Sequence, residues 1–134
     1  MKAFDPTTIL VIGNDAHFCY LMKRYVKESG HQIEISFLTR GAVELVQKNR
    51  PAAIVLEVDL PDTTGWEVLR ALKDDLTICD IPILLCSWLE DERRGLEEGA
   101  DVYMRMPILY KDFLAALTDI GVAAGDGDFP GGIE

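Results

Sequence analysis

The chain has 134 residues, a length typical of one domain that buries its own core. Its 13 basic and 23 acidic residues give a net charge of −10, which argues against nucleic acid as a direct partner because phosphate binding needs a basic surface. No apolar stretch approaches the roughly 20 residues that span a bilayer, and residues 1–6 lack the basic and apolar regions of a signal peptide. We therefore expect a cytoplasmic protein with no membrane partner.

Short apolar runs alternate with segments of helical periodicity along most of the chain. The first run is followed by Gly13, Asn14 and Asp15, which predict a strand end and a helix start with Asn14 or Asp15 as its cap. The predicted elements, in chain order, are a strand over 8–12, a helix over 17–27, a strand over 32–37, a helix capped by Thr39 and ending at Asn49, a strand over 53–57, a helix over 66–73, a strand over 83–86, a helix over 89–98, a strand over 101–105 and a helix over 109–121.

Five strands that alternate with five helices predict an α/β fold. The strands are almost continuously apolar, which indicates a parallel sheet covered on both faces. Right-handed crossovers favour a doubly wound fold. We expect this domain to cover residues 1–122, and the Gly- and Asp-rich residues 123–134 to be a disordered tail or the remnant of a linker.

In a doubly wound fold the working crevice lies beyond the carboxyl ends of the strands. Here those ends carry Gly13, Asn14, Glu57, Ser87 and Met106. Glu57 stands out, because an ionised carboxylate at the end of a buried strand loses hydration and needs compensation.

Three stretches of the chain resemble the receiver domain of bacterial two-component response regulators. They are IVLEVDLPDTTGWEVL at residues 54–69, PILLCS at residues 82–87 and GADVYMRMP at residues 99–107, and the resemblance covers about residues 8–122. It implies a flavodoxin-like (βα)5 doubly wound sandwich with a five-stranded parallel sheet in the strand order 2-1-3-4-5. It also implies a site with an aspartate acceptor, two acids that hold Mg²⁺, a Ser or Thr, and a lysine that pairs with the phosphoryl group.

Four of those five positions depart from the family pattern. Glu57 stands at the acceptor position, Gly13 and Asn14 replace the acidic pair, and Met106 replaces the lysine, whereas Ser87 is retained in kind. Asp15 lies one position too late for the acidic pair and is expected to cap the helix instead. We therefore predict a degenerate pseudo-receiver that is not an enzyme, is not phosphorylated, has no cofactor and binds Mg²⁺ weakly or not at all.

The main alternative is an atypical receiver that is phosphorylated on Asp59 or Glu57. Glu57 itself has three interpretations: a hydrogen bond to Ser87 or Asn14 that stabilises the crevice, a mimic of the phosphorylated state, or a group that is still modified or binds metal weakly. Period-two alternation places Asp59 on the side of Glu57, and two nearby carboxylates predict a raised pKa for one of them. A flavodoxin-type ligand binder is disfavoured, because no glycine-rich phosphate loop follows the first strand.

The resemblance also implies an output face made by the fourth helix, the fifth strand and the fifth helix. Tyr103 matches the switch aromatic of the family. It could form an apolar docking patch with Trp88, Ile108 and Tyr110, or these side chains could simply pack within the domain. Arg105 should point away from the crevice by alternation, and Trp88 either plugs the crevice or lies beside Tyr103. We expect a protein partner at this face, with a homodimer as the alternative.

Overall fold

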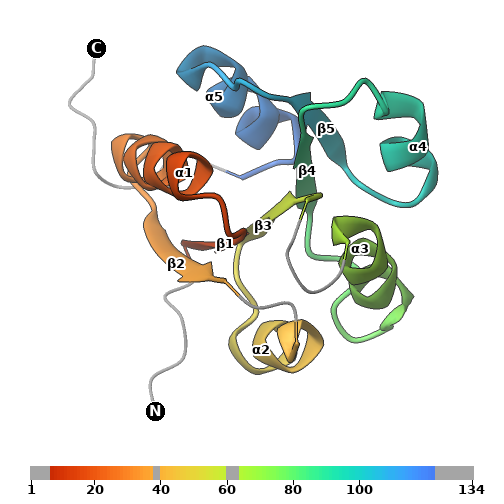
Figure 1. Ribbon diagram of the computed structural model, residues 1–134. Coiled ribbons are helices and arrows are strands. Elements are labelled where there is room, and N and C mark those ends of the chain that lie inside the picture. Colours follow the sequence, from red (N-terminus) through yellow and green to blue (C-terminus); the bar gives the residue numbers. More distant parts are fainter. Residues whose placement is uncertain (1–6, 38–39, 60–63, 123–134) are drawn as a thin grey trace.

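The computed structural model describes residues 7–37, 40–59 and 64–122, in which five strands and five helices alternate (Figure 1). Thr39, residues 60–63 and the predicted tail at 123–134 lie outside the described residues. The elements are β1 (Thr8–Ile12), α1 (Ala16–Glu28), β2 (Gln32–Ser36), α2 (Ala42–Asn49), β3 (Ala53–Glu57), α3 (Gly65–Asp74), β4 (Ile83–Ser87), α4 (Glu92–Glu97), β5 (Val102–Arg105) and α5 (Tyr110–Asp119).

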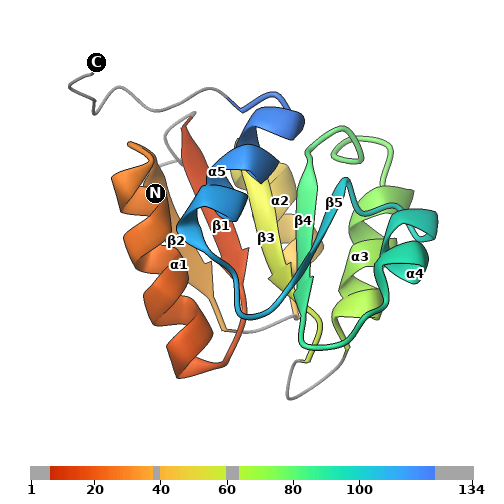
Figure 2. The same cartoon turned by 90° about the horizontal axis from the view of Figure 1, so that it is seen from above.

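The strands form one parallel sheet in the order β2-β1-β3-β4-β5, which confirms the predicted topology. Helices α1 and α5 cover one face of the sheet, and α2, α3 and α4 lie on the other (Figures 1 and 2). Each face buries its own apolar cluster, the first around Met22 and Phe113 and the second around Leu56 and Leu69. The central strands β1, β3 and β4 are buried along their full length, as their continuous apolar runs require.

The helix predicted over 89–98 is wrong at its start, because α4 begins only at Glu92. The Leu89 N–H donates to the Ser87 Oγ at 3.1 Å, and the Asp91 N–H donates to the Tyr103 hydroxyl at 3.2 Å. These contacts hold the chain after β4 as a loop, and the second of them comes from β5, which follows later in the sequence.

Among the described residues, none of the helices has the length and apolar composition needed to cross a bilayer. The longest helix, α1, instead packs through its inner face on the sheet and on α5. The Tyr25 ring lies 5.2 Å from the Tyr110 ring between centroids, and its hydroxyl donates to the Ile108 carbonyl at 2.7 Å. This contact fixes the first and last helices against each other at the edge of the crevice.

Candidate functional site

Glu57 is the centre of the site at the carboxyl ends of β1, β3 and β4. Its side chain is buried, with 3% exposure. Its Oε1 accepts a hydrogen bond from the Asn14 N–H at 2.9 Å and a longer one from the Asp15 N–H at 3.3 Å. The predicted bond to Asn14 is therefore confirmed, although it comes from the backbone of the turn between β1 and α1.

The alternative prediction, a hydrogen bond between Glu57 and Ser87, is wrong. Ser87 is buried, and its hydroxyl accepts from the Leu89 N–H. No hydrogen bond joins Ser87 to Glu57 within the described part of the chain. The extra methylene of glutamate therefore carries the carboxylate toward the β1–α1 turn and away from the retained hydroxyl.

Gly13 makes room for this arrangement. A Cβ placed on Gly13 would lie 2.9 Å from Glu57 Oε1 and 3.0 Å from Phe18 Cε2. Contacts of this length are closer than packed atoms tolerate, so any larger residue would push against the carboxylate. In the sequence, Gly13 is recognisable only as a missing metal ligand. The sequence signal for this packing is that position 57 carries a longer side chain than the family's aspartate, while position 13 carries glycine, whose side chain is a hydrogen atom.

The pKa of Glu57 is raised. Burial is the main cause, since it disfavours the charged form, and repulsion from Asp15 and Asp59 adds to it. The hydrogen bonds from the Asn14 and Asp15 N–H groups oppose the shift. The predicted direction is confirmed, but the expected repulsion between carboxylates is secondary to the loss of hydration. Asp59 itself is exposed and its backbone forms an isolated bridge with Thr64.

The raised pKa makes the stability contributed by Glu57 depend on pH. Because the folded state holds this proton more strongly than the unfolded chain, stability should fall as pH rises from the ordinary pKa of 4.5 through the raised folded value, and then level off. Compared with Glu57→Gln, the wild type should lose about 1.4 kcal/mol for each unit of the shift. Urea unfolding of both proteins from pH 4 to pH 8 measures this difference. The other carboxylates are present in both proteins, so their contributions to the pH dependence cancel when the two free energies of unfolding are subtracted. A difference that stays flat or grows with pH would contradict it.

Asp15 caps α1, as predicted. Its Oδ1 accepts from the His17 N–H at 2.8 Å and from the Phe18 N–H at 3.4 Å. Its side chain is thereby committed to the helix end, so that only its charge acts on Glu57.

Removing this cap should cost about 1 kcal/mol of stability in Asp15→Ala, because two N–H groups at the helix start lose their acceptor. Asp15→Asn is the matched control, since asparagine caps equally well without the charge. Chemical denaturation of the three proteins measures the effect. Equal losses in both variants would show that the charge, rather than the cap, supplies the stability.

The lysine position of the family is occupied by a buried side chain, Met106, with 7% exposure. It lines a small apolar cavity of about 70 Å³ together with Phe18 and Trp88. Trp88 is 52% exposed and borders the crevice on the α1 side. The predicted role of Met106 as apolar filler is confirmed, and an uncharged wall stands where a cation would be required.

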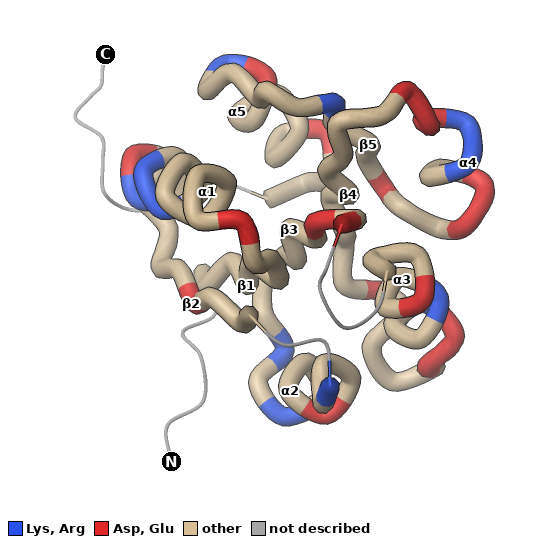
Figure 3. The backbone as a smooth tube through the Cα atoms, in the orientation of Figure 1, with Lys and Arg blue, Asp and Glu red and all other residues tan. Residues whose placement is uncertain are grey.

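Arg105 does not replace that cation. Its guanidinium donates to the Trp88 carbonyl at 3.3 Å and pairs with Glu90 at 3.2 Å, so it points away from Glu57 as alternation predicts. Figure 3 shows acidic residues at the start of α1 and at the end of β3, which lie at the same edge of the sheet.

The donor set does not fit a divalent cation. Within the ranges 7–37, 40–59 and 64–122, no group of three or more His, Cys, Asp or Glu residues is placed to hold a metal ion. Gly13 has no side-chain ligand atom, and the turn directs N–H donors at the buried Glu57 carboxylate. Such donors favour an anion at this place and oppose a bound cation.

The predicted docking patch is not one continuous surface. Ile108 is buried at 3% exposure, and Tyr110 packs on Tyr25, so both serve the contact between α1 and α5. Tyr103 lies on the α4 side, where its hydroxyl donates to the Leu89 carbonyl and its ring lies against Gly95. Trp88 borders the cavity on the α1 side. For Ile108 the patch prediction is wrong, because the residue fills the space under Tyr25.

Comparison with known proteins places this arrangement in a family. The model described as the response regulator receiver domain matches residues 9–118. Response regulator MprA of Mycolicibacterium vanbaalenii is 32% identical over 115 residues, which cover 84% of this chain and 49% of that protein. The phosphate regulon transcriptional regulatory protein PhoB of Pseudomonas aeruginosa is 30% identical over 130 residues, which cover 95% of this chain and 57% of that protein. The chain spans about half the length of these curated relatives.

Solved structures agree on the fold. The chemotaxis protein CheY4 of Vibrio cholerae superposes with a TM-score of 0.76 at 21% identity, over 87% of this chain and 99% of that one. A response regulator receiver domain protein from Clostridium thermocellum gives a TM-score of 0.75 at 18% identity, over 85% and 93%. Since the family match runs from β1 to α5, the chain belongs to the response regulator receiver domain family.

Proposed function

We propose that this chain is a signalling module that acts through protein contacts and does not accept a phosphoryl group. The observation that carries the proposal is the position of the Glu57 carboxylate, which is held by the Asn14 N–H beside Gly13. Phosphoryl transfer needs an acceptor oxygen in line with the donor and cations on the transferred group. Here one oxygen of the Glu57 carboxylate, Oε1, accepts hydrogen bonds from the β1–α1 turn, and uncharged Met106 stands at the lysine position.

Incubation with acetyl phosphate and Mg²⁺, followed by intact mass measurement, tests the proposal. We expect the mass of the chain to stay unchanged under conditions in which a receiver with the aspartate, acidic pair and lysine is modified. A stoichiometric gain of one phosphoryl group would overturn it.

The alternative, an atypical receiver, is favoured by one observation. Asp59 is exposed at the rim of the site, next to residues 60–63 that lie outside the described part. If the mass does increase, the Asp59→Asn and Glu57→Gln variants identify the acceptor, because only the variant that lacks it will stay unmodified.

The protein partner is proposed to bind at the face formed by α4, β5 and α5. Four leucines on or beside these helices have large exposed fractions: Leu89 at 59%, Leu96 at 46%, Leu109 at 55% and Leu114 at 37%. Large apolar side chains left exposed on the elements of a proposed face support an interaction surface there. A homodimer is the alternative occupant. Light scattering separates the two, since a dimer that Leu96→Glu dissociates would favour self-association, whereas a monomer favours a different protein.

A further inference from the structure

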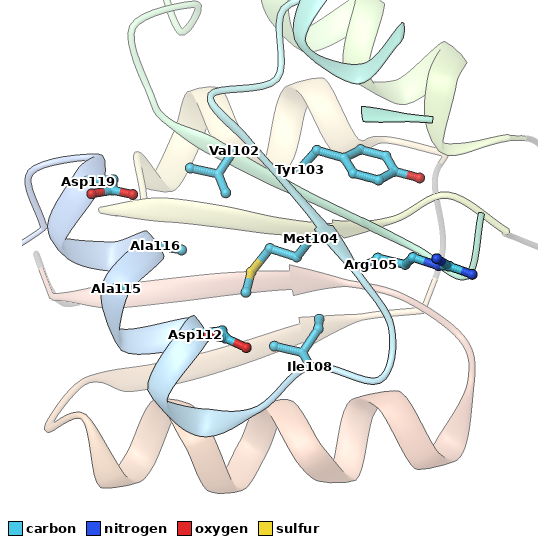
Figure 4. A pocket seen from close by; sticks show the side chains of 9 residues that line it. All are labelled: Val102, Tyr103, Met104, Arg105, Ile108, Asp112, Ala115, Ala116 and Asp119. Carbon is cyan, nitrogen blue, oxygen red and sulfur yellow. The ribbon is translucent and has the colours of Figure 1, made fainter. Parts of the chain in front are cut away.

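A groove of about 290 Å³ lies between α5 and β5 (Figure 4). The side chains of Val102 and Met104 point from the strand toward α5, where Ile108 completes an apolar floor. Tyr103 and Arg105 point to the opposite side of the strand, as period-two alternation requires. The groove therefore runs along the strand itself, since four consecutive residues of β5 line it.

The groove lies at an open edge of the sheet. β5 is the last strand, and among the described strands it pairs only with β4. An edge strand presents unpaired N–H and C=O groups that another chain can use. At β5 this edge is short, and it is flanked by a helix that leaves space beside it.

The residues of α5 that line the groove explain why it is open and why it is negatively charged. Asp112, Ala115, Ala116 and Asp119 line it from successive turns. The alanines leave the groove open between the two aspartates, which stand about 10 Å apart along the helix axis. Both aspartates are exposed, and none of the ion pairs in the described residues uses them. Arg105, the cation among the lining residues, is paired with Glu90.

We propose that the free edge of β5 binds an extended basic segment of a partner protein, which adds to the sheet as a sixth strand. The inference rests on the proposed function and specifies how its partner docks. Backbone pairing with β5 would supply affinity, and alternate side chains of the segment would contact the α5 and β5 sides of the groove. Apolar residues would lie on Val102, Met104 and Ile108, and Lys or Arg residues would reach Asp112 and Asp119.

Charge decides between an extended basic segment and a second copy of this chain. A copy docked at the same groove would bring two sets of unpaired aspartates together and would carry its own net charge of −10. Like charges at close range oppose association. A basic segment is instead attracted by the same negative charges.

The test uses the full chain, labelled for NMR, and an acetylated and amidated (Lys-Val)4 peptide as the probe. We expect chemical shift changes centred on Val102–Arg105 and α5, together with slower amide exchange in β5. Asp112→Asn/Asp119→Asn should weaken binding about tenfold at low salt. Ala115→Trp, at an exposed position, should fill the groove and abolish binding. Glu44→Gln/Asp74→Asn is the matched control, because it removes two exposed charges from α2 and α3 and should leave binding unchanged.

Several results would overturn the inference. They are no binding of (Lys-Val)4, binding that survives Ala115→Trp, equal binding of (Glu-Val)4, or equal binding of (Lys-Pro)4, which lacks half of the N–H donors needed for strand pairing. Self-association that Ala115→Trp prevents would identify a second copy as the occupant instead. The acetyl phosphate experiment does not depend on this groove, so failure here leaves the proposed lack of phosphorylation standing, and the reverse also holds.

Discussion

Gly13→Ala should destabilise the domain by about 2 kcal/mol, because the added methyl group enters space that the Glu57 carboxylate occupies. The new Cβ would lie 2.9 Å from Oε1, and the ring of Phe18 blocks retreat on the other side at 3.0 Å. The carboxylate must then leave its hydrogen bond to the Asn14 N–H, which leaves a buried acid poorly satisfied. Urea unfolding of both proteins near pH 7 measures the loss.

A double-mutant cycle with Glu57→Ala shows whether the two positions compete for one space. Truncation of Glu57 removes the nearer clash, so Gly13→Ala should cost at least about 1 kcal/mol less in that background. Gly95→Ala is the control, because its Cβ would meet Tyr103 at 2.7 Å on the opposite face of the sheet. Its cost should add to that of Glu57→Ala without coupling. If Gly13→Ala also adds without coupling, Gly13 does not accommodate the glutamate.

This coupling links two departures from the family pattern that look independent in the sequence. A longer acid at position 57 needs hydrogen-bond donors for its carboxylate and room to reach them. The N–H groups of Asn14 and Asp15 are those donors, and Gly13 supplies the room. A side chain at position 13 that could bind a metal would remove the room. Glutamate at position 57 and a metal ligand at position 13 therefore compete for the same space.

The fold was predictable from the sequence because its signals are local. Each buried strand is a short apolar run, and turn or capping residues stand between the elements, which together predict a doubly wound parallel sheet. The observed order 2-1-3-4-5 was implied by the resemblance to the receiver family. The Asp15 cap was predictable for the same reason, since it acts on N–H groups two and three residues away. Such signals depend on neighbouring residues in the chain and can be read from the sequence without knowledge of tertiary contacts.

Other features depend on residues that are distant in the sequence. The start of α4 is set by Tyr103, whose hydroxyl bonds to the Leu89 carbonyl and the Asp91 N–H. The direction of Glu57 is set by a turn more than forty residues earlier, as the bond between residues 14 and 57 shows. Ile108 is apolar and follows Pro107, a pattern that fits an exposed loop equally well. Its burial under Tyr25 becomes evident only once α1 and α5 are packed.

Rebuilding the family's site should give the chain the phosphoryl transfer that we propose it lacks. The four changes are Glu57→Asp, Gly13→Asp, Asn14→Asp and Met106→Lys. The first withdraws the carboxylate from the β1–α1 turn and so frees the space beside position 13, where Phe18 must still shift by a few tenths of an ångström. The others supply carboxylates for Mg²⁺ and an ammonium for the transferred group. Ser87 already stands at the end of β4.

With acetyl phosphate and Mg²⁺, the fourfold variant should be modified at least about 100-fold faster than the wild type, because acceptor position and charge stabilisation are each worth factors of this order. Glu57→Asp alone should stay unmodified, since its metal ligands and ammonium are still missing. Replacing the acceptor change with Glu57→Asn in the fourfold background gives a control that should bind Mg²⁺ without modification. Time-resolved intact mass separates these cases. Rapid modification of Glu57→Asp alone would show that the turn and Met106 impose no barrier, and that the length of one side chain is what keeps this receiver unphosphorylated.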